Sequence, residues 1–154
     1  MFTTNTPSPT AHHQPDRSEY SAGDALPPVG VAVTFTRLER AWNNADGVAF
    51  AAEFTDDAEF IDIRGDHHHG RAAIGAGHQA IFDTIYRGST ITYSVEDVRG
   101  PSRGGTVALV GAVLHVPAGP LAGRHQSRLT ARLVEQDNGL AIAAFHNTLV
   151  QPTN

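Results

Sequence analysis

The sequence contains no cysteine and no lysine. Without cysteine, the chain can form no disulfide bond, no thiolate nucleophile and no sulfur-ligated metal site. Its eleven basic residues are all arginines, and they are scattered along a chain with a formal net charge of −5 and a pI near 5.9. Binding to nucleic acid needs a concentrated basic surface, so the composition argues against a nucleic-acid partner.

Long apolar runs are lacking as well. No window approaches the roughly 18 apolar residues that cross a bilayer, and no basic start followed by an apolar stretch marks a secretory signal. We therefore expect no membrane partner and a cytoplasmic protein. A chain of 154 residues corresponds to about one domain with a single core.

Composition divides the chain into two parts. Residues 1–28 contain five of the nine prolines and almost no regularly spaced apolar residues. Such a segment buries too little surface to offset the entropy of ordering it. We expect a flexible arm over 1–28 and one folded domain over 29–154.

The first half of the domain shows helical periodicity. One apolar stripe predicts a first helix, and it consists of Val31, Phe35, Leu38 and Trp42. Asp46 is a suitable N-cap for a short second helix that presents Phe50 and Phe54. A third helix opens at Arg71, and its stripe consists of Ile74, His78, Ile81, Phe82 and Ile85.

The strand pattern dominates the second half. A turn at Thr55-Asp56-Asp57 leads into a strand over 58–64, and a loop with three histidines follows over 65–70. Four further strands are expected over 89–99, 106–115, 124–135 and 140–150, with hairpin turns at Gly104-Gly105 and Asp137-Asn138-Gly139. Helices followed by an antiparallel run indicate an α+β fold.

Four ionisable side chains are candidate catalytic groups: Asp62, His78, His115 and His146. Apolar neighbours would raise the pKa of Asp62 toward a useful acid–base range, and a histidine titrates there without much tuning. The structural alternatives are an Asp62 carboxylate satisfied by Arg64 or by a backbone amide, and a His78 that is hydrogen-bonded in the core. Alternation does not decide which face of its strand His115 or His146 shares with the interior.

Two further clusters favour structural roles. His67, His68 and His69 are adjacent, so neighbouring side chains point in different directions and the spacing is a weak metal signal; we expect no metal. Alternate polar residues along 124–132 indicate a solvent-facing or dimer-forming side of one strand, or an arginine site for an acidic ligand or a carrier-protein phosphopantetheine.

Three segments carry a resemblance to a known family: AWNNADGVAFAAEFTDDAEF, GRAAIGAGHQAIF and AFHNT. Over residues 29–150 the sequence resembles the SnoaL-like branch of the NTF2-like superfamily, and within it the small proteins associated with enediyne polyketide biosynthesis. The resemblance implies an NTF2-like cone, in which three helices close a strongly curved, mostly antiparallel sheet around a blind apolar pocket. It also implies a homodimer formed through the outer face of the sheet.

A hydrophobic small molecule is the ligand that this resemblance implies. We expect the pocket to be lined by Trp42, Phe54, Phe60, Phe82, Tyr86 and Tyr93. Neither tyrosine matches the tyrosine of the related ketosteroid isomerases, so that mechanism is not transferred. We expect cyclisation or isomerisation of a polyketide-derived intermediate without cofactor, with Asp62 as base and histidines as donors. The alternative is a non-catalytic binding protein that shields a reactive intermediate.

Overall fold

The structure, a computed structural model, describes residues 29–153. The flexible arm expected over 1–28 lies outside the described residues. The elements in chain order are α1 (Val29–Asn43), α2 (Gly47–Ala51), β1 (Phe54–Ile61), β2 (His67–His69), α3 (Arg71–Phe82), β3 (Thr90–Ser102), β4 (Gly105–Val116), β5 (Gly123–Gln136) and β6 (Gly139–Leu149).

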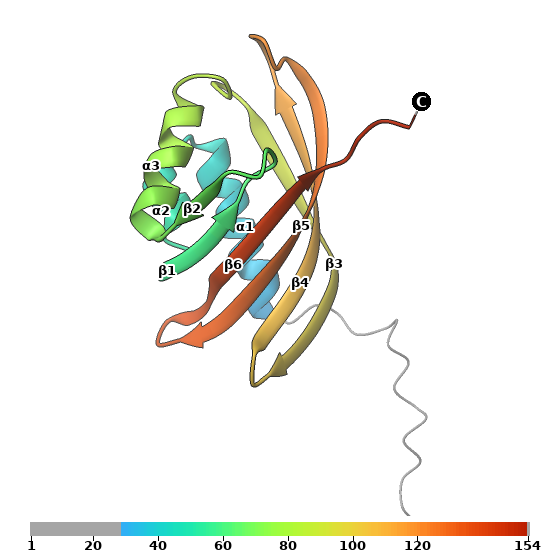
Figure 1. The fold of residues 1–154 in the computed structure, drawn as a ribbon. Coiled ribbons are helices and arrows are strands. Elements are labelled where there is room, and N and C mark those ends of the chain that lie inside the picture. Colours follow the sequence, from blue (N-terminus) through green and yellow to red (C-terminus); the bar gives the residue numbers. More distant parts are fainter. Residues whose placement is uncertain (1–28, 154) are drawn as a thin grey trace, which may run out of the picture.

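All the strands join one sheet, in the order β2-β1-β6-β5-β4-β3. Neighbouring strands are antiparallel except β1 and β6, which run parallel. The sheet curls, and the helices lie against its concave side (Figure 1). This confirms the predicted α+β fold, a cone of helices packed on a strongly curved and mostly antiparallel sheet.

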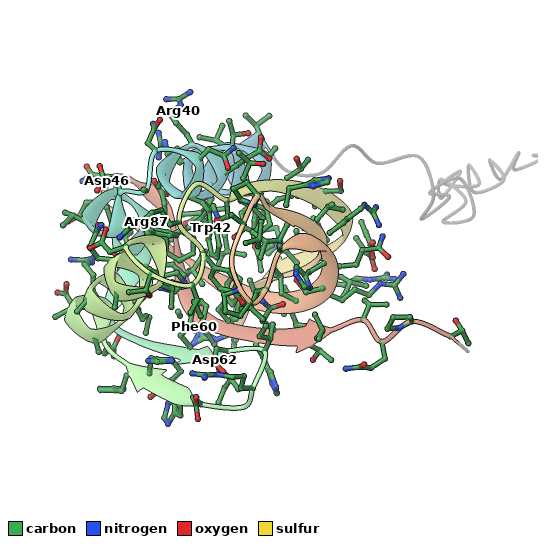
Figure 2. The ribbon with its side chains drawn as sticks, turned by 90° about the horizontal axis from the view of Figure 1, so that it is seen from above. Arg40, Trp42, Asp46, Phe60, Asp62 and Arg87 are labelled. Carbon is green, nitrogen blue, oxygen red and sulfur yellow. The ribbon has the colours of Figure 1, made fainter. Side chains whose placement is uncertain are left out.

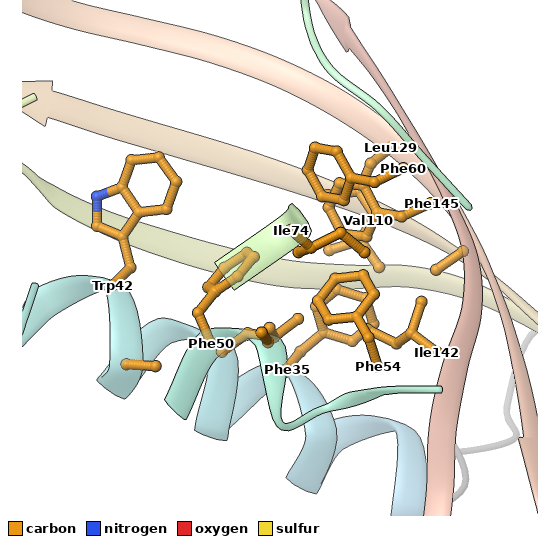
Figure 3. Close-up of a cluster of buried hydrophobic side chains, with 14 of the residues drawn as sticks. Phe35, Trp42, Phe50, Phe54, Phe60, Ile74, Val110, Leu129, Ile142 and Phe145 are labelled. Atoms are coloured by element: carbon orange, nitrogen blue, oxygen red, sulfur yellow. The ribbon is translucent and has the colours of Figure 1, made fainter. Parts of the chain in front are cut away.

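Alternation along the strands separates an inner from an outer face. On β4, Ala108 and Val110 are fully buried, whereas Val107 and Leu109 on the other face are 40% and 39% exposed. The buried residues of the inner face meet the apolar stripe of α1 and form one core with α2 and α3 (Figure 3). The inner side is therefore the one on which a ligand would meet the helices.

The helices form where the sequence pattern predicts them. Every member of the predicted α1 stripe is buried, and the side chain of Asp46 caps α2 by accepting a hydrogen bond from the amide of Ala49 at 2.9 Å. Gly47 lets α2 approach α3, since a β-carbon there would lie 2.6 Å from the carbonyl oxygen of Gly75. On α3 the predicted stripe is buried except for Ile81, which is partly buried, and Ile85, which lies beyond the helix and is 39% exposed.

Two boundaries differ from the sequence prediction. β1 begins at Phe54, so the expected turn at residues 55–57 is part of the strand, and an irregular register between Phe54 and Glu59 accommodates it. Phe54 belongs to β1 and not to the second helix, because it pairs with Ile142 of the neighbouring strand β6. The expected histidine loop forms the short strand β2 along β1.

Within residues 29–153, none of the helices combines the length and the apolar character needed to cross a bilayer.

Candidate functional site

Asp62 stands at the point where β1 ends and the chain turns toward β2. One carboxylate oxygen, Oδ1, accepts hydrogen bonds from the amides of Arg64 at 2.9 Å and Asp66 at 3.0 Å. The other, Oδ2, lies 3.1 Å from Nε2 of His68. One oxygen therefore shapes the turn, while the other forms an aspartate–histidine pair.

The hydrogen bonds set the protonation state of Asp62. Partial burial alone would raise the pKa of this carboxyl, but the hydrogen bonds from His68 and from the amides of Arg64 and Asp66 outweigh burial and lower the pKa. This is opposite to the direction expected from the sequence. Asp62 is therefore an ionised partner that orients His68, and it is a weaker base than predicted.

His68 is placed by strand pairing. Its register partner on β1 is Phe60, which is buried on the inner face, whereas His67 and His69 point to the other side. The His68 side chain is 33% exposed. A β-carbon on Gly77 of α3 would lie 3.7 Å from its Nδ1, so the bare glycine leaves this nitrogen uncovered. With Nε2 donating to Asp62, Nδ1 is the ring nitrogen of His68 that lies toward Gly77 of α3.

His78 lies deeper, on the buried side of α3. Its Nδ1 donates to the carbonyl oxygen of Ile74 at 2.7 Å, and its ring stacks on Phe50 with centroids 4.1 Å apart. Burial lowers the pKa of His78 to about 4, with the nearby charge of His68 acting in the same direction. His78 is therefore neutral at physiological pH, and its fixed tautomer leaves Nε2 as an acceptor.

Aromatic rings surround this polar group. Phe60 meets His78 edge-on at 5.0 Å, and Trp42 contacts Phe82 at 4.9 Å and Tyr86 at 5.8 Å between ring centroids. Figure 2 shows Trp42 and Phe60 between the helices and the sheet, with Asp62 beside Phe60. The pair formed by His68 and Asp62 lies at the edge of this layer of aromatic rings.

Tyr86 contributes a hydroxyl to the same end of the cone. Burial raises the pKa of Tyr86, the charge of Asp62 raises it further, and the guanidinium of Arg64 opposes both. Trp42, by contrast, uses its polar atom internally, since Nε1 donates to the hydroxyl of Ser89 at 3.0 Å. Tyr86 therefore remains protonated at neutral pH and can donate a hydrogen bond.

The other predicted site residues lie elsewhere. His115 and His146 are exposed on the outer face of the sheet, next to the buried residues Val116 and Phe145 of their strands, so neither of these candidate catalytic groups joins Asp62 and His78 on the inner side. Phe54 is fully buried between Phe50, Phe60 and Phe145. Tyr93 lies beneath α1, where burial raises the pKa of its hydroxyl and where its amide donates to Glu39.

The remaining two histidines of β2 pair with a carboxylate on the outer side. His69 Nδ1 lies 2.9 Å from Oε1 of Glu59, and His67 is hydrogen-bonded to Oε2 of the same side chain. These hydrogen bonds lower the pKa of Glu59. Among residues 29–153, no three His, Asp or Glu side chains are grouped so that they could hold a metal ion.

Sequence reasoning missed His68 as a site residue. The signal was present, since three adjacent histidines in an extended segment place the middle side chain opposite its neighbours. What the sequence does not reveal is that a three-residue segment pairs with β1 and so turns His68 inward.

The fold places the chain among proteins that pack helices into a strongly curved antiparallel sheet, the cystatin-like architecture. The sequence itself is more specific, because the model of the SnoaL-like domain family matches residues 31–150. The chain therefore belongs to the family of SnoaL-like domains. A comparison with functionally characterised proteins found no match.

Solved structures share this fold. A Caulobacter vibrioides protein with a cystatin-like fold is 26% identical, with a TM-score of 0.70 over 80% of this chain and 89% of that one. ActVI-ORFA from Streptomyces coelicolor is 18% identical, with a TM-score of 0.67 over 78% and 95%. A ketosteroid isomerase-like protein from Erwinia carotovora atroseptica is 16% identical, with a TM-score of 0.65 over 79% and 95%.

Proposed function

We propose that this SnoaL-like protein binds a hydrophobic polyketide-derived intermediate and cyclises or isomerises it by acid–base chemistry. The observation that carries the proposal is the 3.1 Å pair between His68 Nε2 and Asp62 Oδ2 at the edge of a buried aromatic layer. Membership in the SnoaL-like family and the resemblance to its enediyne-associated branch support the choice of a polyketide ligand. In its most specific form, the proposal assigns the ligand to the biosynthesis of enediyne polyketides.

The proposed chemistry follows from the hydrogen bond between His68 and Asp62. Nδ1 of His68 takes a proton from a carbon beside a ligand carbonyl, and the C–H electron pair becomes an enolate. Asp62 stabilises the imidazolium that forms, and the hydroxyl of Tyr86 donates a hydrogen bond to the enolate oxygen. The enolate carbon then attacks a second carbonyl carbon of the same molecule, whose oxygen takes the proton from His68; in an isomerisation another carbon takes it.

The test uses 2-tetralone, a hydrophobic ketone with acidic α-hydrogens, in D₂O. We expect the protein to accelerate hydrogen–deuterium exchange at the α-carbons, followed by NMR, and His68→Gln to reduce the protein-catalysed rate by about 10²-fold or more. His115→Gln is the matched control, because this histidine is exposed on the outer face. Equal exchange with the wild-type protein and with His68→Gln would refute the catalytic proposal.

A non-catalytic shielding protein is the second candidate. It is favoured by the use of Asp62 Oδ1 as a turn-forming acceptor, which gives this residue a structural reason to be present. Binding of 2-tetralone without any His68-dependent exchange would select this alternative.

We further propose a homodimer that forms through the outer face of the sheet and works in the cytoplasm. Val107 and Leu109 expose apolar surface on this face. Arg132 of β5 is the register partner of Val107, and Arg128 of the same strand lies 3.8 Å from Glu96. Exposed apolar side chains next to charged ones are common in protein interfaces. A second copy of the chain is the occupant that we propose.

A further inference from the structure

Three consecutive histidines, His67, His68 and His69, form the strand β2. Their side chains alternate between the two faces of the sheet, so His68 lies on the inner face and its two neighbours lie on the outer face. β2 stands at the edge of the sheet, next to β1. The proposed acid–base chemistry uses the inner histidine and gives the two outer ones no part.

Glu59 of β1 contacts both outer histidines. It is exposed between the buried residues Ala58 and Phe60, so its side chain lies on the outer face. Oε1 of Glu59 accepts a hydrogen bond from Nδ1 of His69 at 2.9 Å, and Oε2 accepts one from Nε2 of His67. These hydrogen bonds lower the pKa of Glu59, so the carboxylate is ionised and can only accept. One carboxylate thus joins the first and the last residue of β2.

A second carboxylate binds β2 from the inner face. Oδ2 of Asp62 lies 3.1 Å from Nε2 of His68, and the ring of Phe60 lies edge-on to the same histidine, with ring centroids 6.1 Å apart. A strand of three residues forms few backbone hydrogen bonds, so side-chain contacts contribute more to its attachment than they do in a long strand. Detachment of β2, or a shift of its register by one residue, would move His68 away from Asp62.

We infer that Glu59 is a positioning residue for His68. By binding His67 and His69 on the outer face, it keeps β2 attached to β1 with His68 turned toward Asp62. The inference rests on the proposed acid–base function and adds to it a residue on the opposite face of the sheet. Glu59 takes no proton in the reaction and touches no reacting atom.

Two NMR measurements test the position of β2 without any ligand. The amide of Gly70, which follows β2, donates to the carbonyl oxygen of Ala58 on β1 at 2.8 Å, so its hydrogen exchange reports detachment of the strand. The NOE between the rings of His68 and Phe60 reports the inward orientation of His68. We expect Glu59→Ala to speed exchange of the Gly70 amide about fivefold and to weaken the NOE, since two exposed pairs together amount to about one net hydrogen bond.

Matched variants separate the effect of Glu59 from a general loss of stability. Glu59→Gln keeps the length of the side chain and one accepting oxygen, so it should restore part of the protection of the Gly70 amide. Glu135→Ala removes an exposed carboxylate from β5, the third strand along from β2, and should leave both measurements unchanged. In a protein that already carries His67→Ala and His69→Ala, Glu59→Ala should have no further effect, because its partners are gone.

Exchange of 2-tetralone separates this inference from the proposed catalysis. Where both hold, Glu59→Ala should lower kcat by at most about fivefold and leave KM unchanged, because only the fraction of correctly placed His68 falls. Wild-type protein that catalyses no exchange refutes the proposed chemistry, whereas NMR measurements that depend on Glu59 still support its positioning role. The inference is overturned if Glu59→Ala keeps the wild-type exchange of the Gly70 amide, if Glu135→Ala speeds that exchange equally, or if Glu59→Ala acts fully without His67 and His69.

Discussion

The protonation of His78 leads to a quantitative prediction about stability. In the unfolded chain its pKa is near the ordinary 6.5, whereas burial lowers it to about 4 in the folded protein. Between these values the unfolded state binds more protons than the folded state, so the free energy of unfolding falls as the pH falls. The contribution of His78 is nearly zero at pH 7, and about 2 kcal/mol of stability is lost between pH 7 and pH 5, since one pKa unit corresponds to about 1.4 kcal/mol.

His78→Phe should remove this loss. A phenyl ring can keep the stacking on Phe50, and the carbonyl of Ile74 still accepts the helical N–H of residue 78. Urea unfolding at pH 7, 6 and 5 should show the variant gaining about 2 kcal/mol over wild type as the pH falls. His115→Gln, on the exposed face, should follow the wild-type curve. If wild type and His78→Phe lose stability in parallel, His78 is not held neutral by burial, and the electrostatic account of the site is wrong.

Four other substitutions test separate features. Gly77→Ala should fold and gain about 1 kcal/mol of helix propensity, yet slow 2-tetralone exchange, because its methyl group covers Nδ1 of His68; unchanged exchange would remove Nδ1 from the mechanism. Gly47→Ala should cost about 1–3 kcal/mol in urea unfolding, since the new methyl group meets backbone at 2.6 Å, and a neutral result would refute the close packing of α2 on α3. Ser89→Ala should cost about 1–3 kcal/mol in the same assay, because the indole N–H of Trp42 loses its buried acceptor. Leu109→Glu should give a monomer in sedimentation velocity if the outer face forms the dimer, and an unchanged sedimentation coefficient would exclude that face.

Periodicity predicted the helices and the sheet because both follow from local patterns. The stripe of α1 and the cap of α2 depend on residues three or four apart, and both are as predicted. The start of β1 was predicted too late. Phe54 was assigned to the second helix because it follows Phe50 by four residues, but its strand pairing with Ile142 involves residues 88 positions away. Such a non-local partner leaves no periodic signal.

The site was predictable only in part, for the same reason. Asp62 and His78 fall on patterned segments, and the structure places both on the inner side. His68 depends on a three-residue strand too short to show a period. Alternation separated the two faces of β4 and β6, but only the packing of the helices decides that His115 and His146 belong to the outer one.

The position of β6 has a consequence for the order in which the protein is made. β6 lies between β1 and β5, yet it follows every other described strand in the chain. During synthesis, β1 and β2 therefore have no larger sheet to join until residues 139–149 have left the ribosome. Until then, the β3–β4–β5 meander lacks its β6 neighbour, and its inner face is not fully covered. Contacts between such distant segments slow folding and leave apolar surface uncovered meanwhile. The nascent chain should accordingly be most dependent on chaperones just before β6 emerges. Ribosome-bound chains with a short C-terminal extension, which keeps β6 inside the exit tunnel, and with a long one, which places β6 outside, should differ sharply in protease resistance.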